Sequence, residues 1–189
     1  MESQKNGLMN ENSRKGLLGE LLFLRELLEK NDSALPVIQG WVGAEGADQD
    51  FMYEDGWHEI KSIGAAATSV TISSLEQLDC AVEGELVIIR IDKSAPDKEG
   101  VLSLNDAVMQ IGSRLAAVSE ALYLFHSKLS TYGYIDLQVY SEQKYYFSGM
   151  QRYGVNETFP KLVRRNVPLQ VASLHYELSL PALAEWLKG

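Results

Sequence analysis

Residues 85–92, ELVIIRID, form the most apolar short run of the chain, and this run constrains the fold more than any other stretch. A short run rich in isoleucine and valine, without polar alternation, is typical of a strand buried inside a sheet. We therefore expect residues 85–92 to form a central strand.

Leucines at helical spacing mark a first helix over residues 13–30. We expect Asn12 or Ser13 to cap its start and residues 31–33 to end it. Glu20 lies near the edge of the buried leucine stripe rather than opposite it. Further helices are predicted over residues 74–79, over residues 104–130 (one helix, or two with Gly112 as the break), and over residues 181–189.

The stretch DFMYEDGWHEIKSIG, residues 50–64, is typical of a β-hairpin, with strands over 50–53 and 57–63 and a turn at 54–56. The order of segments predicts an α/β (α+β) domain, in which helices flank a mixed β-sheet. Residues 132–189 are expected to form a β-rich C-terminal extension packed on the same domain. The other β-forming segments are residues 34–43, read as extended after Pro36, and residues 68–73, 144–155 and 168–180.

Composition limits the class of protein. No apolar run is long enough to span a membrane, and the N-terminus lacks the apolar core of a signal peptide. The single cysteine excludes an internal disulfide and favours the cytoplasm. A formal net charge of −9 argues against a protein that binds nucleic acid through broad lysine and arginine coverage. Acids gathered at a metal site can nevertheless coexist with a local basic groove.

The hairpin carries a candidate metal site. Strand alternation places Glu59 and Lys61 on one face, the hairpin can bring Asp50 beside them, and the first helix can bring Glu20. Three carboxylates about 5 Å apart would repel one another by roughly 3 kcal/mol per pair at an effective dielectric of ~20, more than one lysine can offset. A divalent cation can offset it, and carboxylate oxygens suit Mg²⁺ or Mn²⁺. One cysteine and three scattered histidines make a structural zinc site a poor alternative.

A hard metal ion beside a lysine is suited to phosphodiester hydrolysis, because the ion polarises a phosphoryl oxygen and activates water. Lys61 would then orient that water or stabilise developing negative charge.

The ordered set Glu20, Asp50 and Glu59-Ile60-Lys61 resembles the core pattern of the PD-(D/E)XK nuclease superfamily. The pieces GLLGELLFLRELLE, QDF, HEIKS, ISSLEQLD, YGVNETFPKL and VPLQVASLHYELSL resemble a bacterial PD-(D/E)XK group found with restriction-type phage-defence systems, so the similarity covers most of the chain. The chain departs from the superfamily motif at Gln49, where a proline is usual.

This resemblance implies a restriction-endonuclease-like core over residues 1–131 and metal-dependent cleavage of DNA. It also implies a role for each matching residue: Asp50 and Glu59 would hold the metal, Glu20 would assist it, Lys61 would be the catalytic lysine, and Gln77 would touch the water or the DNA. Other restriction-system subunits are the implied protein partners. A homodimer is a separate expectation, because long neighbouring helices could mediate one and a double-strand cut would favour one.

Several alternatives stay open at this stage. Glu59 and Lys61 can be ordinary solvent-facing residues of a hairpin, and Asp48 can take the place of Asp50 because residues two apart share a face. His58 points away from Glu59 and is read as structural or exposed. The whole protein can instead be a binding or scaffolding subunit of a restriction complex with little activity of its own. The densest basic cluster is read as a solvated loop, with phosphate contact as the alternative: Lys161, Arg164 and Arg165, with Arg152 upstream.

Overall fold

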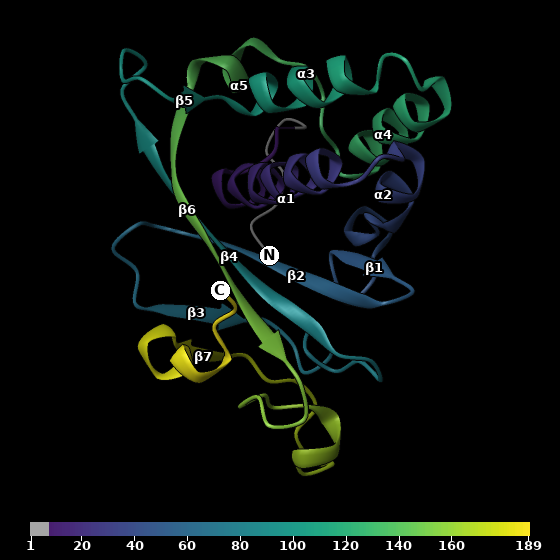
Figure 1. The fold of residues 1–189 in the computed structure, drawn as a ribbon. Coiled ribbons are helices and arrows are strands. Elements are labelled where there is room, and N and C mark those ends of the chain that lie inside the picture. Colours follow the sequence, from purple (N-terminus) through teal and green to yellow (C-terminus); the bar gives the residue numbers. More distant parts are fainter. Residues whose placement is uncertain (1–7) are drawn as a thin grey trace.

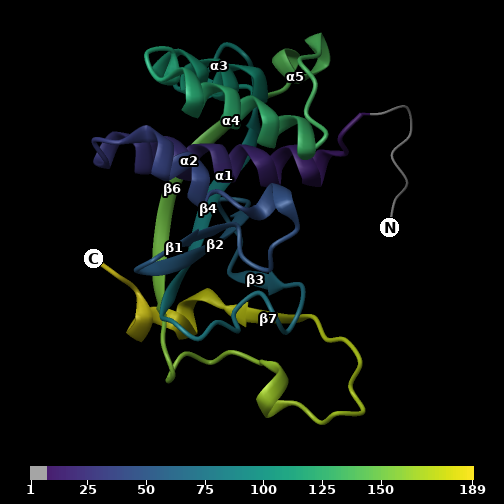
Figure 2. The ribbon, with the colours of Figure 1, turned by 90° about the vertical axis from the view of Figure 1, so that its right-hand side faces the viewer.

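A computed structural model describes residues 8–189 and shows a mixed β-sheet between two unlike layers (Figure 1). Helices cover one face of the five-stranded sheet. A two-stranded sheet and a short 3₁₀ helix cover the other face (Figure 2). The predicted fold class, a mixed sheet flanked by helices, is confirmed.

The main sheet has the strand order β1-β2-β4-β6-β5. β2 and β4 are parallel, and all other neighbours are antiparallel. The strands are β1 (Phe51–Tyr53), β2 (Gly56–Ile63), β4 (Gly84–Ser94), β5 (Val101–Leu102) and β6 (Lys144–Val155).

β4 is the central strand that its apolar sequence predicts, and it is buried on both faces. Val87, Ile89 and Ile91 pack into the core under the helices. Leu86 and Ile88 point the other way, into the second core. This alternation explains why the run has no polar face: both faces of the strand are covered.

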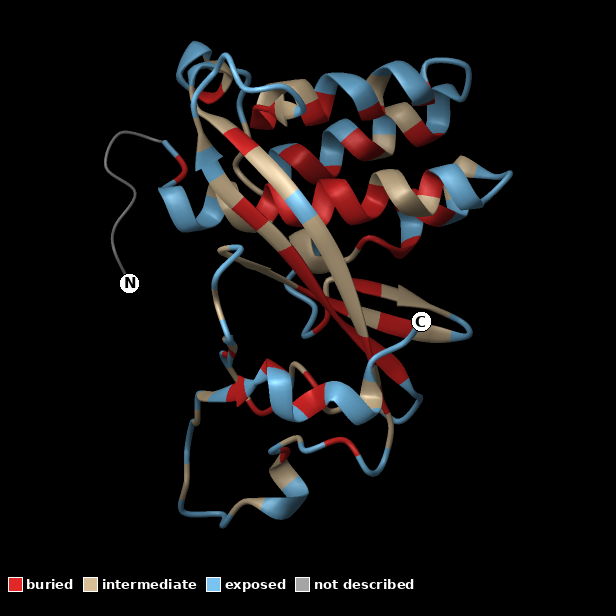
Figure 3. Cartoon of the chain, turned by 60° about the vertical axis from the view of Figure 1, so that its left-hand side comes forward, coloured by how far each residue is buried: buried red, intermediate tan, exposed pale blue. Residues whose placement is uncertain are grey.

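The helical layer contains α1 next to the sheet, with α3 and α4 stacked beyond it (Figures 1 and 2). In Figure 3 the buried residues gather along α1 and along the middle of the sheet. The helices are α1 (Glu11–Lys30), α2 (Ala34–Gly40), α3 (Leu104–Leu115), α4 (Ser119–Thr131) and α5 (Gln138–Glu142), with a 3₁₀ turn η1 (Gly43–Glu45) after α2.

The second face is covered by the antiparallel pair β3 (Ser69–Ile72) and β7 (Tyr176–Ser179) and by the 3₁₀ helix η3 (Leu180–Trp186). A further 3₁₀ turn, η2 (Arg164–Asn166), lies in the loop between β6 and β7. Residues after 131 therefore supply both a strand inside the main sheet and part of the second layer. The division into a core over 1–131 and an extension over 132–189 stays a prediction.

The structure corrects several predicted elements. Most of the predicted extended segment 34–43 is the helix α2 (Ala34–Gly40), which accepts Pro36 because a missing N–H does no harm in the first turn. Trp41, directly after it, is extended and pairs with Phe51. Residues 74–79 form turns rather than a helix. α1 begins at Glu11 with Asn10 as its cap, and the break between α3 and α4 lies at 116–118 rather than at Gly112. Of residues 168–180, only β7 is a strand.

Within residues 8–189, no helix combines the length and apolar character needed to cross a membrane.

Candidate active site

Asp50 and Glu59 lie side by side at the start of the hairpin. The β1–β2 register pairs Phe51 with His58, so the next position along pairs Asp50 with Glu59. Asp50 Oδ2 accepts a hydrogen bond from the backbone N–H of Ile60 at 2.8 Å, which ties the aspartate to β2. Asp48 is exposed and has no such anchor, so the geometry favours Asp50 of the two candidates.

Glu59 is buried, with 2% of its surface exposed. Its Oε1 lies 2.9 Å from the ammonium of Lys61. Its Oε2 is buried without a hydrogen-bond partner among the described residues. A buried carboxylate oxygen left unpaired is costly, so this atom marks a position where a cation or a donor would be stabilising.

Lys61 lies between Glu59 and Gln77. Its Nζ donates to Gln77 Oε1 at 3.0 Å, and the same oxygen accepts from the backbone N–H of Ser73 at 2.7 Å. The structure thus brings Gln77 into contact with Lys61, although Gln77 lies in a turn segment and not on the predicted helix. Its predicted contact with the water or the DNA stays a prediction. Glu59 and Lys61 are not the solvent-facing pair of an ordinary hairpin.

Glu20 lies in the helical layer, on α1, and is 7% exposed. Its Oε2 accepts hydrogen bonds from the indole N–H of Trp41, at 2.8 Å, and from the hydroxyl of Tyr132. The Tyr132 hydroxyl also lies near Asp50: a methyl group on Gly43 would meet the hydroxyl oxygen at 2.7 Å and Asp50 Oδ1 at 2.9 Å.

Burial dominates the electrostatics of the three acids. Burial and the neighbouring charge of Asp50 raise the pKa of Glu59 to about 8, against the opposing effect of Lys61. Burial also raises the pKa of Asp50 to about 6, although the Ile60 N–H and Lys61 act in the opposite direction. Burial and the charge of Asp50 raise the pKa of Glu20. The acids therefore interact, and their ionised forms are disfavoured when no cation is bound.

The three acids do not form one shared set of ligands. Residues 8–189 contain no group of three histidine, cysteine, aspartate or glutamate side chains placed to hold a metal ion. Glu20 is already engaged by Trp41 and Tyr132. Mg²⁺ commonly binds through one or two carboxylates and keeps several waters. The residues present therefore fit an ion held by Asp50 and Glu59, with the unpaired Oε2 as one ligand, better than the predicted three-acid site.

Three residues around Glu20 were not identified from the sequence. Trp41 and Tyr132 come from distant segments, and Lys128, one turn before Tyr132 on α4, donates to the backbone carbonyls of Trp41 and Gln39 at 2.5 and 3.1 Å. The 4-residue spacing of Lys128 and Tyr132 places them on one helix face. A spacing of four residues is common in helices, so nothing in the local sequence could have singled out Lys128 and Tyr132 as residues of this site.

The basic cluster packs beside the segment that carries Gln77. Arg165 Nη1 lies 2.9 Å from Asp79 Oδ1, and Arg164 donates to the backbone carbonyls of Val171 and Ala172. Burial and the charge of Arg165 lower the pKa of Lys161. Arg152 does not join this cluster, because it lies on β6 and contacts Glu85.

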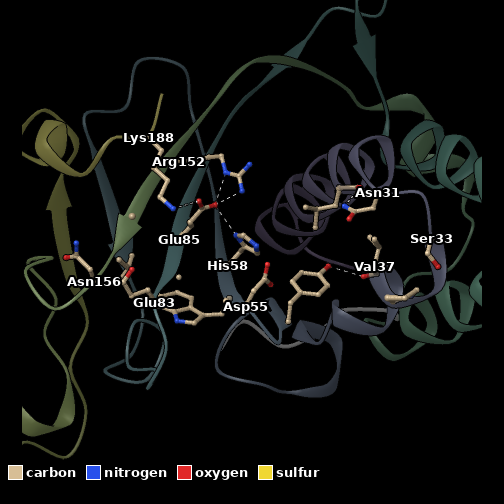
Figure 4. A pocket seen from close by; sticks show the side chains of 18 residues that line it. Asn31, Ser33, Val37, Asp55, His58, Glu83, Glu85, Arg152, Asn156 and Lys188 are labelled. Atoms are coloured by element: carbon tan, nitrogen blue, oxygen red, sulfur yellow. Dashed lines mark hydrogen bonds and ion pairs between the residues drawn. The ribbon is translucent and has the colours of Figure 1, made fainter.

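A cavity of about 750 Å³ lies elsewhere, between the end of α1 and the start of β4 (Figure 4). Inside it, Glu85 is bound by His58, Arg152 and Lys188 at 2.6–3.1 Å. Burial acts to raise the pKa of Glu85, but the hydrogen bonds from these three side chains and the charge of Arg152 outweigh it and hold that pKa well below its usual range. His58 faces the helical layer, away from Glu59, so its predicted structural place agrees with the geometry.

Comparison with protein families gives one match, which covers residues 1–181. The matching family, DUF4420, is described as "Putative PD-(D/E)XK family member". The chain belongs to this family. DUF4420 membership is consistent with the order of Glu20, Asp50, Glu59 and Lys61 along the fold. Searches of curated proteins and of solved structures give no match.

Proposed function

We propose that this DUF4420 protein is a metal-dependent nuclease that hydrolyses phosphodiester bonds in DNA, with Mg²⁺ or Mn²⁺ as its ion. One observation carries the proposal: the Lys61 ammonium is held between Glu59 Oε1 and Gln77 Oε1, while Glu59 Oε2 is buried and unpaired. A partly buried lysine beside an incompletely paired acid with a raised pKa, next to a second such acid, is an arrangement of the kind found at functional sites.

The protein's own residues have separable roles in this proposal. Asp50 and Glu59 hold the ion, which when bound neutralises phosphate charge and makes water at the site more acidic. An ammonium has three N–H groups, and Glu59 and Gln77 occupy two of those of Lys61. The third can donate to a phosphate oxygen or orient the attacking water, which stabilises the charge that develops in the transition state.

Glu20 assists from the helical layer in this proposal. Its pKa is raised, and Trp41 and Tyr132 fix the position of its carboxyl group. The charge of Asp50 acts on Glu20 and adds to the rise in its pKa. We therefore assign Glu20 a supporting role and not that of a direct metal ligand.

Membership of a family described as PD-(D/E)XK supports a nuclease-like role. DNA as the substrate and a bacterial restriction or phage-defence system as the setting come from the sequence resemblance and are part of the proposal. A cytoplasmic location, other restriction-system subunits and a homodimer stay predictions from the sequence.

Plasmid nicking in Mn²⁺ tests the proposal. We expect the wild-type protein to nick supercoiled DNA and Lys61→Ala to reduce nicking at least ~100-fold, a typical loss for an electrostatic catalytic group. Lys93→Ala, which removes an exposed lysine paired with Glu11, is the matched control and should keep full activity. Calorimetric titration should show Mn²⁺ binding that Asp50→Asn abolishes. Equal nicking by wild type and Lys61→Ala, or no Mn²⁺ binding by wild type, would overturn the proposal.

A binding or scaffolding subunit is the second candidate. The net charge of −9 and the lack of a three-acid cluster within residues 8–189 favour it. It predicts neither nicking nor Mn²⁺ binding by the wild type, together with a stable complex between this chain and a separate restriction enzyme, measured by co-purification.

A further inference from the structure

Gln49 is a buried polar side chain whose partners are all backbone atoms. It is 5% exposed and directly precedes Asp50. Its Nε2 donates to the carbonyl oxygen of Glu76 at 3.0 Å and, at the longer distance of 3.4 Å, to that of Gln77. Two interactions from one amide connect the start of the hairpin to a segment almost thirty residues later.

The segment that receives these bonds lacks regular structure. Between β3 and β4, residues 73–80 form neither helix nor strand, while Leu75 and Leu78 anchor them in the core. Backbone carbonyls in such a segment have no strand ladder to satisfy them, so they depend on local turns and on side-chain or water donors. The Glu76 carbonyl accepts from the backbone N–H of Asp79 at 3.0 Å as well as from Gln49. Gln49 supplies a side-chain donor where the segment approaches Lys61.

The same segment carries the amide that contacts Lys61. Gln77 Oε1 accepts from Lys61 Nζ and from the backbone N–H of Ser73. Its backbone carbonyl accepts from Gln49. The backbone carbonyl and the side-chain oxygen of Gln77 are therefore both held by hydrogen bonds, and the side-chain oxygen points toward Lys61.

We infer that Gln49 is a positioning residue for Lys61, acting through the backbone of residues 76–77 and the side chain of Gln77. Two consecutive residues then set the geometry of the site: Asp50 docks on β2 through the N–H of Ile60, and Gln49 fixes the partner of the lysine. A proline at position 49 could not do this, because its side chain has no donor. An effect of Gln49 on catalysis depends on the proposed function. The structural link from Gln49 to Lys61 does not depend on it.

The direct test measures how readily Lys61 reacts with a methylating reagent (formaldehyde and borohydride), followed by mass spectrometry of the full chain. Gln49→Met keeps the volume of the side chain and removes its N–H groups. We expect the rate of Lys61 methylation to rise about threefold to tenfold, the range set by the loss of one or two net hydrogen bonds. Gln77→Met should give a rise of similar size. Gln110→Met, which removes a partner of Arg25 in the helical layer, is the control and should change nothing at Lys61.

Lys128 provides an internal standard, because it is buried elsewhere with its own carbonyl partners. A rise at Lys61 with no change at Lys128 supports the inference. An unchanged Lys61 rate in Gln49→Met overturns it, and so does an equal rise at Lys61 and Lys128, since that shows general loosening of the fold.

Nicking and Mn²⁺ titration of the same variants separate this inference from the proposed function. If the wild type nicks DNA, Gln49→Met should lower the rate at saturating Mn²⁺ and leave the affinity for Mn²⁺ within about twofold, because Asp50 and Glu59 keep their places. If the wild type neither nicks DNA nor binds Mn²⁺, the proposed function is wrong. The methylation rates then still show whether Gln49 positions Lys61.

Discussion

Tyr132 stacks on Trp41, with ring centroids 5.4 Å apart and planes inclined by 20°, and both residues donate to the same carboxylate oxygen of Glu20. Tyr132 lies at the end of α4 and Trp41 at the end of α2, so α1, α2 and α4 meet at one buried acid. The pair gives Glu20 a fixed place that α1 alone could not give it.

Removal of the Tyr132 hydroxyl should therefore destabilise the fold. Tyr132→Phe keeps the ring stacked on Trp41 but leaves the buried Glu20 with one donor fewer. We expect the free energy of unfolding to fall by about 1–3 kcal/mol, measured by urea denaturation. Tyr123→Phe is the control, because Tyr123 is 78% exposed, and it should change stability very little. Equal stability of the Tyr132 and Tyr123 variants would contradict a supporting role for this hydroxyl.

Lys128 should be as important to stability as a core residue. It is 4% exposed, and its ammonium satisfies the carbonyls of Gln39 and Trp41 and pairs with Glu45 at 2.8 Å. Lys128→Met leaves those carbonyls unpaired and should cost about 1–3 kcal/mol. Lys30→Met removes an exposed surface pair with Glu26 and should cost under about 1 kcal/mol. Chemical denaturation of both variants checks the difference, and a smaller loss for Lys128 than for Lys30 would refute it.

Gly43 should not tolerate a side chain. An added methyl group would lie 2.7 Å from the Tyr132 hydroxyl oxygen and 3.2 Å from the backbone Cα of Asp50, so Asp50 and Tyr132 would both have to move. We expect Gly43→Ala to lower the melting temperature and to weaken Mn²⁺ binding. Gly16→Ala is the matched control: nothing lies within 4 Å of its added methyl group, and it sits inside α1. Alanine should stabilise that helix by up to about 1 kcal/mol. A Gly43→Ala protein with wild-type Mn²⁺ affinity would show that the contact is unimportant to the site.

Stability of the metal-free protein should fall as the pH rises from about 4.5 to about 8, and Glu59 should contribute to this fall together with Asp50 and Glu20, whose pKa values are also raised. In the unfolded chain Glu59 loses its proton near its ordinary pKa of 4.5, whereas in the folded chain it keeps the proton up to about pH 8. The unfolded state binds fewer protons across this window, so each rise in pH favours unfolding. Above the folded pKa both states are ionised and the loss is complete. Urea denaturation at a series of pH values measures the slope.

Glu59→Gln should make that slope shallower, because only the contributions of Asp50 and Glu20 remain, and should make the metal-free protein more stable than the wild type at pH 8. Mn²⁺ should raise the melting temperature of the wild type at pH 8 and not that of Glu59→Gln. A wild-type slope unchanged by the substitution would contradict the assignment to Glu59.

The part of the site that lies within the hairpin could be predicted from the sequence. Period-two alternation fixes the relation of Glu59 to Lys61, and the short turn brings Asp50 beside them. The surroundings of Glu20 could not be predicted, because Trp41 and Tyr132 lie 21 and 112 residues away and their approach depends on the packing of three helices. The predicted helix over 74–79 was wrong for a related reason: Gln49 and the core leucines, not local propensity, decide the shape of that segment.

β6 has a consequence for biosynthesis. It pairs with the second edge of β4 through residues that follow β4 by about sixty positions, as in the pairing of Arg90 with Gly149. While the ribosome is still making α3 and α4, that edge has no partner, and its unpaired backbone N–H and C=O groups can pair with another chain. Pairings of this sequence separation form slowly. A newly made chain is therefore most exposed to aggregation through β4 before residues 144–155 have emerged from the exit tunnel.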